Sequence, residues 1–318
     1  MKRGSERALG LALGYAADRA FRDPARFHPV AGFGTVASTL ENLTYRDSRS
    51  SGAAHVAALV GGVILLGKAI DRGGVPATAL ATWVALGGSS LAATGNAMAD
   101  HLQADDIAAA RSLLPSLCGR DPDLLDSLGL ARAALESVAE NTSDATVAPL
   151  FWGAVAGVPG LLGYRAINTL DATIGYRNDR YNNFGWAAAR TDDVANLVPA
   201  RITGALTVAL APTIGGSAKQ ALRAWRRDAH KHPSPNAGVA EASAAGALGI
   251  TLGGRTAYRH GVEQRPELGD GSAPDGADLQ RAVRLSSNVQ LASAALAVAV
   301  GKLVFLRRRR NPLGGHRN

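Results

Sequence analysis

The residues from Gly73 to Ala99 read GGVPATALATWVALGGSSLAATGNAMA and carry no formal charge. A helix that crosses a bilayer needs about 20 mostly apolar residues, so this run is long enough to span a membrane. Four further uncharged runs occur at Ser50–Gly67, Ala145–Tyr164, Ile202–Ala218 and Leu285–Gly301. The set predicts an all-α, multi-span integral membrane protein with long polar helical and loop segments between its spans.

The predicted organisation is a single membrane-embedded domain over residues 1–318. Its spans are expected at about 50–67, 73–99, 145–164, 202–218 and 285–306, with a candidate extra span at 8–17. Pro159–Gly160 interrupts the third run, which leaves a broken or re-entrant helix and a plain kinked span both open. For residues 8–17 a signal peptide is the alternative, and for the whole set it is the buried helices of a soluble domain.

The net charge, the sequence motifs and the single cysteine limit the kinds of partner and site that the chain can have. The net charge of +8 would suit nucleic acid, an anionic membrane surface or anionic substrates. No nucleic-acid motif accompanies it, and Arg307–Arg310 directly follow an apolar run, as in a membrane-flanking cluster. The lone Cys118 excludes an intrachain disulfide and a thiolate metal site. We therefore expect no nucleic-acid partner and a bilayer around the spans.

Four polar blocks separate the spans, at residues 18–49, 100–144, 165–201 and 219–284. The second has apolar residues at helical spacing and is predicted to be helical. Residues 263–278 are rich in Gly, Pro, Asp and Glu and are predicted to form a flexible loop.

Acidic residues recur at intervals of four at Glu136, Glu140 and Asp144, so a helix would place them on one face. Like charges at that spacing repel, which makes the face costly unless a cation or substrate compensates it. A solvated helix face is the alternative. The position of the three acids beside an apolar run favours a functional role.

The block from Tyr164 to Arg201 is the richest in polar side chains. It combines arginines with Asp and Asn pairs, such as Asn168 with Asp171 and Asp192 with Asn196, that would share helical faces. Guanidinium groups bind phosphoryl oxygens and carboxylates bind magnesium, so this mixture suits a site for phosphate and Mg²⁺. An interfacial belt would explain the aromatic residues of the block but would not need its aspartates.

Two proline-containing turns complete the candidate motifs. Asp23, His28 and Pro29 form a compact polar group after the first apolar run, and a plain surface turn is the alternative there. The stretch from His230 to Gly238 is a turn that opens a helix, whose N–H groups could meet an anion. His230 and His232 lack neighbouring carboxylates in sequence, so they are not expected to bind a metal.

These blocks resemble the CobD/CbiB family of cobalamin biosynthesis proteins, the adenosylcobinamide-phosphate synthases. The resemblance rests on five stretches in the family's order, which together cover most of the chain. They are Asp18–Gly34, Asp105–Arg111 with Gly119–Asp121, Glu136–Trp152, Tyr164–Arg201 and Ser234–Gly254. Residues 255–288 match loosely, so no site residue is taken from them.

The resemblance implies a carbon–nitrogen ligase in the bacterial plasma membrane. It would join (R)-1-amino-2-propanol, or its O-phosphate, to the free propionate of adenosylcobyric acid. The product would be adenosylcobinamide or its phosphate. ATP and Mg²⁺ are expected, because a carboxylate must be activated, for example as an acyl phosphate, before an amine attacks it. Other corrinoid-assembly enzymes are further candidate partners.

The roles assigned to individual residues follow from their chemistry at the matching positions. The expected catalytic residues are Glu140, Asp144, Asp171, Asp192 and Asp193, and the last three are also the expected Mg²⁺ ligands. The expected substrate- and phosphate-binding residues are His28, Asn141, Arg165, Asn168, Arg177, Asn178, Arg180, Arg190, Asn196, Arg201, Ser234, Asn236 and Glu241. All of them are expected to converge on one pocket at the lipid boundary.

A corrinoid transporter, or a scaffold subunit without ligase chemistry, is the alternative function, because no ATP-binding fold is recognisable. The basic C-terminal tail favours a cytoplasmic end, and the active site is expected to face the cytoplasm.

Overall fold

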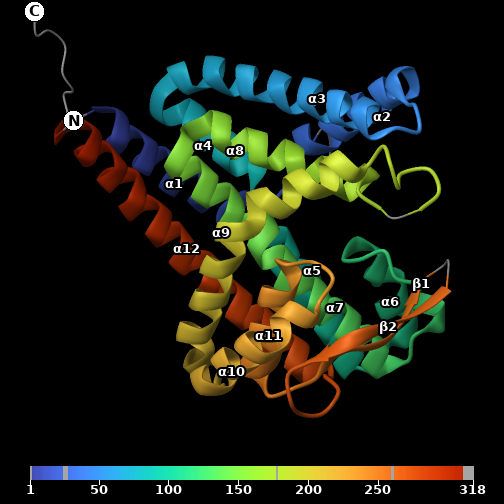
Figure 1. The fold of residues 1–318 in the computed structure, drawn as a ribbon. Coiled ribbons are helices and arrows are strands. Elements are labelled where there is room, and N and C mark those ends of the chain that lie inside the picture. Colours follow the sequence, from blue (N-terminus) through green and yellow to red (C-terminus); the bar gives the residue numbers. More distant parts are fainter. Residues whose placement is uncertain (1, 24–27, 177, 259–260, 311–318) are drawn as a thin grey trace, which may run out of the picture. The chain divides into compact units, whose positions relative to one another are not determined.

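The computed structural model describes residues 2–23, 28–176, 178–258 and 261–310 (Figure 1). The chain forms two compact units. The first contains Met1–Leu86, Pro149–Asp192 and Ser293–Asn318, and the second contains Gly87–Ala148 and Asp193–Ala292. The family resemblance covers parts of both units.

The first unit is built from helices. They are α1 (Lys2–Phe21), α2 (Pro29–Thr44), α3 (Arg49–Ile70), α4 (Gly74–Ala85), nearly all of α8 (Ala148–Ile174), the start of α9 (Trp186–Leu210) and the end of α12 (Gly276–Arg310). Glycine allows the close contact between α1 and α4: a Cβ added at Gly10 or Gly14 would lie within 2.5 Å of Thr78 or Thr82. Small residues at such contacts let helix backbones approach closely.

The second unit contains α5 (Gly88–Gln103), α6 (Ile107–Leu113), α7 (Ser127–Thr142), α10 (Ala218–Asp228), α11 (Ala237–Leu248) and the remaining parts of α9 and α12. Its core includes Met98, Leu114, Leu130 and Leu135. Every residue of α11 is buried. A helix of Ala, Gly, Val, Ser and Leu can be enclosed on all sides, and the one charge it carries, Glu241, is enclosed with it.

A two-stranded antiparallel hairpin follows α11, with β1 (Leu252–Tyr258) paired to β2 (Gly261–Leu268). A bulge lies between Leu252 and Gly254. The loop predicted over residues 263–278 is therefore wrong up to Leu268. The amino-acid composition of residues 263–268 predicted a loop because it has little preference for extended structure. The hydrogen bonds to β1 make this segment a strand.

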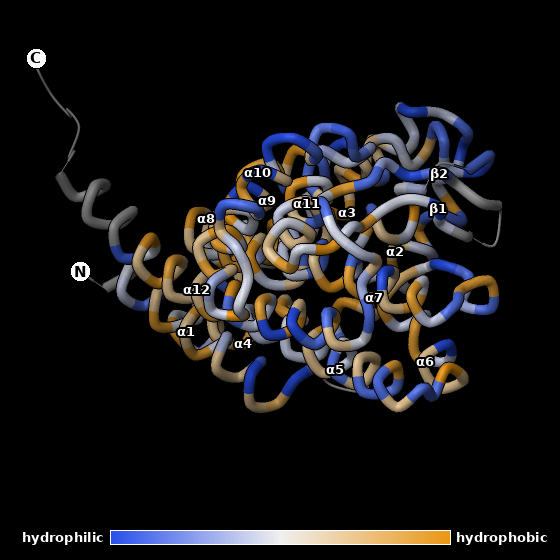
Figure 2. The backbone as a smooth tube through the Cα atoms, turned by 90° about the horizontal axis from the view of Figure 1, so that it is seen from below, coloured by the Kyte–Doolittle hydropathy of each residue, from blue (hydrophilic) through white to orange (hydrophobic). Residues whose placement is uncertain are grey.

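Four helical stretches of the described residues are long and apolar enough to cross a membrane, namely Arg49–Gln103, Ser127–Ile174, Trp186–Ile214 and Gly276–Lys302. The predicted all-α, membrane-protein class is confirmed. In Figure 2 the tube of α4, and that of α12 beside its label, is mostly orange to white. All five predicted spans overlap these four stretches, and the candidate span at 8–17 lies in α1, outside them.

Two span boundaries differ from the prediction. The run 73–99 is two helices, because Leu86 is extended and Gly87 begins a new chain direction before α5. The span predicted at 202–218 ends earlier: α9 stops at Leu210, and a 3₁₀ turn with Pro212 leads to Gly215 at φ 70°. The same helix begins at Trp186, so it includes charged residues that a search for uncharged runs excludes.

The run 145–164 contains a real break in α8. A π-helical turn at Ser143–Val147 precedes the helix, and Gly157 has the non-helical φ of 72°. Two side chains form hydrogen bonds with backbone groups that lose their helical partners at this break. Arg7 Nη1 donates to Ala154 O at 3.3 Å, and the Val158 N–H donates to Asp71 Oδ1 at 3.4 Å. The predicted interruption is confirmed, although it is centred on Gly157 and not on Pro159–Gly160.

Candidate functional site

A group of charged side chains is buried in the second unit. We call it the Glu136 cluster and define it as Arg120, Glu136, His232, Glu241 and Arg265. The Arg120 guanidinium donates to Glu136 Oε2 in a buried ion pair, and Arg265 Nη1 lies 3.9 Å from the same oxygen. Removing charges from water is costly unless they are paired, so this pairing is what permits Glu136 to lie in the core.

The hairpin supplies the second partner of Glu136. The Gly253 N–H donates to Glu136 Oε1 at 2.7 Å. Gly253 has a φ of 82°, and a Cβ there would lie 2.0 Å from the Pro266 carbonyl oxygen. Only glycine fits this backbone position. The hairpin therefore contributes a main-chain donor and Arg265 to the cluster.

His232 and Glu241 form the other half of the Glu136 cluster. His232 Nε2 lies 3.6 Å from Glu241 Oε1. His232 Nδ1 lies 3.0 Å from the Ser234 backbone nitrogen and 3.2 Å from the Ser234 carbonyl oxygen, so Ser234 fixes the ring with Nε2 facing Glu241. Glu241 is only 2% exposed. The two groups are thus held close together away from solvent.

Burial sets the protonation of this pair. It raises the pKa of Glu241 well above its ordinary value, and the negative charges of Glu136 and Glu140 raise it further. Burial also lowers the pKa of His232, with Arg265 acting in the same direction. Both groups favour their neutral forms, which is the usual consequence of desolvation. A neutral carboxylic acid beside a neutral imidazole can hold or release a proton.

The start of α11 is fixed by the Ser234–Gly238 turn. Ser234 Oγ accepts from the Asn236 and Ala237 N–H groups at 3.3 and 3.2 Å. Asn236 Nδ2 donates to Asp193 O at 2.8 Å, and Asn236 Oδ1 accepts from Arg201 Nη1 at 2.7 Å. The turn therefore serves as a helix cap that links α11 to α9.

The three acids predicted to share one helical face lie in different surroundings, and Asp144 lies in the π-helical turn Ser143–Val147 that follows α7. Glu136 is buried, whereas Glu140 is exposed and Asp144 is half-buried. Asn141 Nδ2 donates to the Ser137 carbonyl and hydroxyl oxygens at 2.9 and 3.1 Å. The repulsion expected from like charges on one face is relieved by pairing one acid with Arg120 and by placing another at the surface.

A second polar group lies in the first unit and joins α8 to α9. Arg165 Nη1 donates to Asn168 Oδ1 at 3.3 Å, and Asn168 Nδ2 donates to Asp192 Oδ1 at 3.5 Å. Asp171 lies one turn beyond Asn168 on α8, and Arg190 is exposed near the start of α9. The predicted sharing of a face by Asn168 and Asp171 agrees with this helix.

Other predicted site residues of the first unit form hydrogen bonds or ion pairs with nearby parts of the fold. Arg180 Nη2 donates to the buried Glu41 at 2.7 Å, and its guanidinium lies 4.2 Å from the Tyr45 ring centroid. Hydrogen bonds to Glu41 and Tyr181 raise the pKa of Arg180. His28 caps α2, since its Nδ1 accepts from the Val30 N–H, and Asn178 Oδ1 accepts from the Tyr181 N–H. Arg177 lies outside the described residues.

Known proteins with similar sequences extend over nearly the whole chain. The family model described as CobD/Cbib protein matches residues 11–286. The chain belongs to this family. Cobalamin biosynthesis protein CobD of Mycobacterium tuberculosis is 60% identical over 307 residues, which are 95% of this chain and 97% of that protein. No solved structure matches the chain.

More distant relatives carry the same name. Cobalamin biosynthesis protein CobD of Rhodobacter capsulatus is 42% identical over 290 residues, covering 88% of this chain and 90% of that protein. The protein of that name from Geobacter metallireducens is 39% identical over 309 residues, covering 91% of this chain and 95% of that protein. The predicted family is confirmed, and the chain has a role in cobalamin biosynthesis.

The described residues hold no group of three or more His, Cys, Asp or Glu side chains that could bind a metal ion. Mg²⁺ in nucleotide sites is commonly held by one or two carboxylates together with substrate phosphates. Asp171 and Asp192, with Asn168 beside them, are oxygen donors that fit this arrangement. The metal site at Asp171, Asp192 and Asp193 stays a prediction.

The structure divides the predicted site residues between its two units. Glu140, Asn141, Asp144, Asp193, Asn196, Arg201, Ser234, Asn236 and Glu241 belong to the second unit, and His28, Arg165, Asn168, Asp171, Asn178, Arg180, Arg190 and Asp192 to the first. Convergence of all of them on one pocket stays a prediction.

Of the Glu136 cluster, only Glu241 was among the expected site residues. The sequence favoured a functional role for Glu136 without assigning it one. Arg120 stands in one of the family stretches, so its position alone could have identified it. His232 was considered only as a metal ligand. Arg265 lies in the loosely matching stretch, and no sequence signal identifies it.

Proposed function

We propose that this CobD/Cbib family member forms an amide between (R)-1-amino-2-propanol, or its O-phosphate, and the free propionate of adenosylcobyric acid. The product is adenosylcobinamide or its phosphate. Family membership supports the pathway. The observation that supports ligase chemistry is the Glu136 cluster, because it combines guanidinium groups with a proton-holding carboxyl group in one buried place.

The reaction poses two chemical problems. A carboxylate is a poor electrophile, and ATP with Mg²⁺ would supply its activation. An amine is protonated at neutral pH and must lose that proton before its nitrogen can attack the acyl carbon. When the C–N bond forms, the activated oxygen leaves with its electron pair.

Glu241 suits the removal of the proton from the ammonium. The pKa of Glu241 is raised above its ordinary value, and a carboxylate with a raised pKa is a stronger proton acceptor than an ordinary one. The ionised form of Glu241 takes the proton, and His232 Nε2, which lies 3.6 Å from Glu241 Oε1, is close enough to respond to the charge of that carboxyl group. Exposed Glu140 lies on the same helix as Glu136, and its negative charge contributes to the raised pKa of Glu241.

Arg265 suits the binding of an anionic substrate group. Its side chain is 23% exposed, and its ion pair with Glu136 is a long one at 3.9 Å. By contrast, Arg120 is buried against Glu136. We assign substrate carboxylate or phosphate to Arg265, and the maintenance of Glu136 in its buried position to Arg120.

The test uses the purified full-length protein in detergent or in vesicles. It is incubated with adenosylcobyric acid, aminopropanol O-phosphate and ATP–Mg²⁺, and the corrinoid is analysed by mass spectrometry. A mass gain equal to aminopropanol phosphate less water, dependent on ATP, supports the proposal. Corrinoid binding without this gain would instead support the carrier or scaffold function, which the membrane-length helices also suit.

A further inference from the structure

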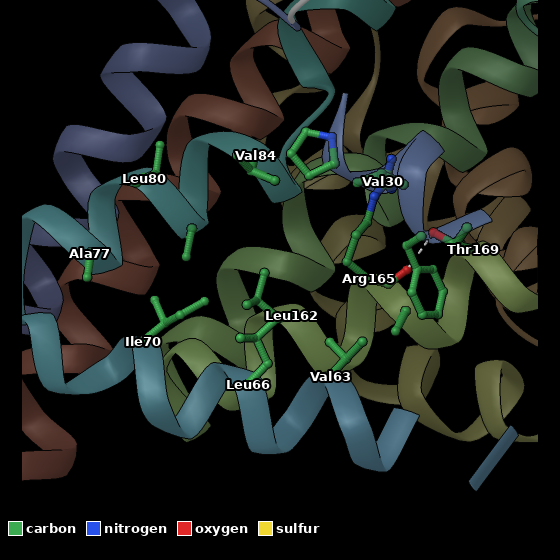
Figure 3. A pocket seen from close by; sticks show the side chains of 14 residues that line it. Val30, Val63, Leu66, Ile70, Ala77, Leu80, Val84, Leu162, Arg165 and Thr169 are labelled. Atoms are coloured by element: carbon green, nitrogen blue, oxygen red, sulfur yellow. Dashed lines mark hydrogen bonds between the residues drawn. The ribbon is translucent and has the colours of Figure 1, made fainter. Parts of the chain in front are cut away.

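A cavity of about 330 Å³ lies within the first unit, between α2, α3, α4 and α8 (Figure 3). All the side chains that line it are apolar except those of Arg165 and Thr169. Two of the lining residues, Leu66 and Leu80, are 57% and 58% exposed. The apolar wall of the cavity therefore continues onto the surface of the unit.

Arg165 gives this cavity a cationic end. In Figure 3 its side chain extends from α8 toward Val30 at the start of α2. Arg165 Nε is buried and has no acceptor among the described residues, while Nη1 donates to Asn168 at 3.3 Å. The Thr169 hydroxyl donates to the carbonyl oxygen of Arg165 and therefore does not serve the guanidinium. A guanidinium among apolar side chains is costly unless an anion meets it.

We infer that the cavity binds an anionic phospholipid, with one acyl chain between α3, α4 and α8 and the phosphate at Arg165. The helices α3 and α4, which carry the exposed Leu66 and Leu80, belong to a stretch long enough to cross a membrane, so the proposal places these two leucines against lipid. The volume is at the small end of ligand pockets, which span roughly 300–1,000 Å³. That size suits a chain better than a macrocycle. The inference does not depend on the proposed ligase activity.

The experiment is native mass spectrometry of the full-length protein after detergent delipidation and incubation with phosphatidylglycerol or phosphatidylcholine. Wild-type protein should retain one phosphatidylglycerol and should retain phosphatidylcholine less well. Arg165→Gln should reduce the retained phosphatidylglycerol at least about tenfold, because it removes a charge-assisted hydrogen bond. Val84→Trp, which fills the cavity, should do the same.

Matched controls separate this site from general lipid attraction. Arg72→Gln removes an exposed arginine of the same unit, and Val36→Trp adds a tryptophan at a valine that is 58% exposed. Both should retain the lipid as wild type does. Retention by both Arg165→Gln and Val84→Trp would overturn the inference. It would also be overturned if inorganic phosphate displaced the lipid from wild type and bound equally well to wild type and to Val84→Trp, since Arg165 would then be a simple phosphate site.

Discussion

Two buried acids show how the surroundings of a carboxyl group change its pKa in this protein. Glu241 and Asp228 are both buried carboxyl groups of the second unit, yet their environments act in opposite directions. Burial and neighbouring carboxylates raise the pKa of Glu241, whereas Asp228 accepts hydrogen bonds from Arg227 and Lys231. The family resemblance identified Glu241 as a candidate, but the sequence could not predict which acid is neutral, because that depends on partners distant in the chain.

We predict that Glu241→Gln lowers kcat/KM for amide formation about a hundredfold, since general-base catalysis contributes roughly 10²–10⁴. In wild type kcat/KM should fall as pH decreases through the raised pKa of Glu241, because the protonated acid cannot accept a proton. This acid limb should vanish in the residual activity of Glu241→Gln. Exposed Glu267→Gln is the control and should keep the wild-type profile. An unchanged acid limb in Glu241→Gln would contradict the assignment.

Glu241 also predicts a pH dependence of stability. Its folded pKa is raised, so the stability it contributes is fully present below the ordinary glutamate pKa and is lost as pH rises through the folded pKa. The wild-type Tm in detergent should therefore decline over this range more steeply than the Tm of Glu241→Gln. Parallel Tm curves for the two proteins would show that Glu241 is ionised in the folded state.

Asp228→Asn should destabilise the second unit. The Asp228 carboxylate accepts from Arg227 Nη2 at 2.6 Å, Lys231 Nζ at 2.8 Å and the Gly269 N–H at 3.0 Å. Although burial raises its pKa, these hydrogen bonds lower it below the ordinary value, so its contribution is present above the unfolded pKa and is lost as pH falls. We expect a loss of about 2 kcal/mol in the free energy of unfolding near neutral pH. Chemical unfolding in detergent measures it, and an equal loss at acidic pH would argue against the ion pairs.

At the level of elements, the sequence of α8 predicted that the helix is interrupted but not the residue at which the interruption lies. Pro159–Gly160 correctly predicted an interruption, but the distortion lies at Gly157, where Arg7 and Asp71 meet the released backbone groups. Those partners come from α1 and the turn after α3, so no local window contains them. The hairpin is a similar case, since β2 owes its extended form to β1.

Gly157→Ala should destabilise the first unit by about 1–3 kcal/mol, because a non-glycine residue is strained at a φ of 72° and the new Cβ would approach Arg7 Nη2 at 2.7 Å. Gly61→Ala in α3 is the matched control, since a Cβ there meets nothing within 4 Å. The control should be neutral or slightly stabilising. Thermal unfolding in detergent compares them, and equal Tm values would mean that the kink is not a fixed feature.

At the scale of the whole molecule, uncharged runs predicted the membrane class, and the five predicted spans overlap the four long helical stretches. They did not predict the division into two compact units, because the chain passes between units within continuous helices such as α9 and α12. The division into units depends on which helix faces pack against each other. The hydropathy of a single helix does not show which other helix it packs against.

The membrane assignment predicts that the protein sediments with membranes and resists extraction by alkaline carbonate, while detergent releases it. Fusion of reporters to the C-terminus should give signal from a cytoplasmic reporter and none from a periplasmic one, as the basic residues Arg307–Arg310 suggest. Release by carbonate alone would contradict membrane spanning, and periplasmic signal would reverse the orientation.

The two oxygens of Glu136 are held by Arg120, which precedes α7, and by the Gly253 amide, which lies 117 positions later in the chain than Glu136. Both contacts of this carboxylate can therefore form only after the segments that carry Arg120 and Gly253 have packed against α7. The amide hydrogen of Gly253 reports this contact: its exchange with deuterated solvent should be slow in the wild-type fold and much faster once Glu136 is replaced by Ala, which removes the acceptor oxygen.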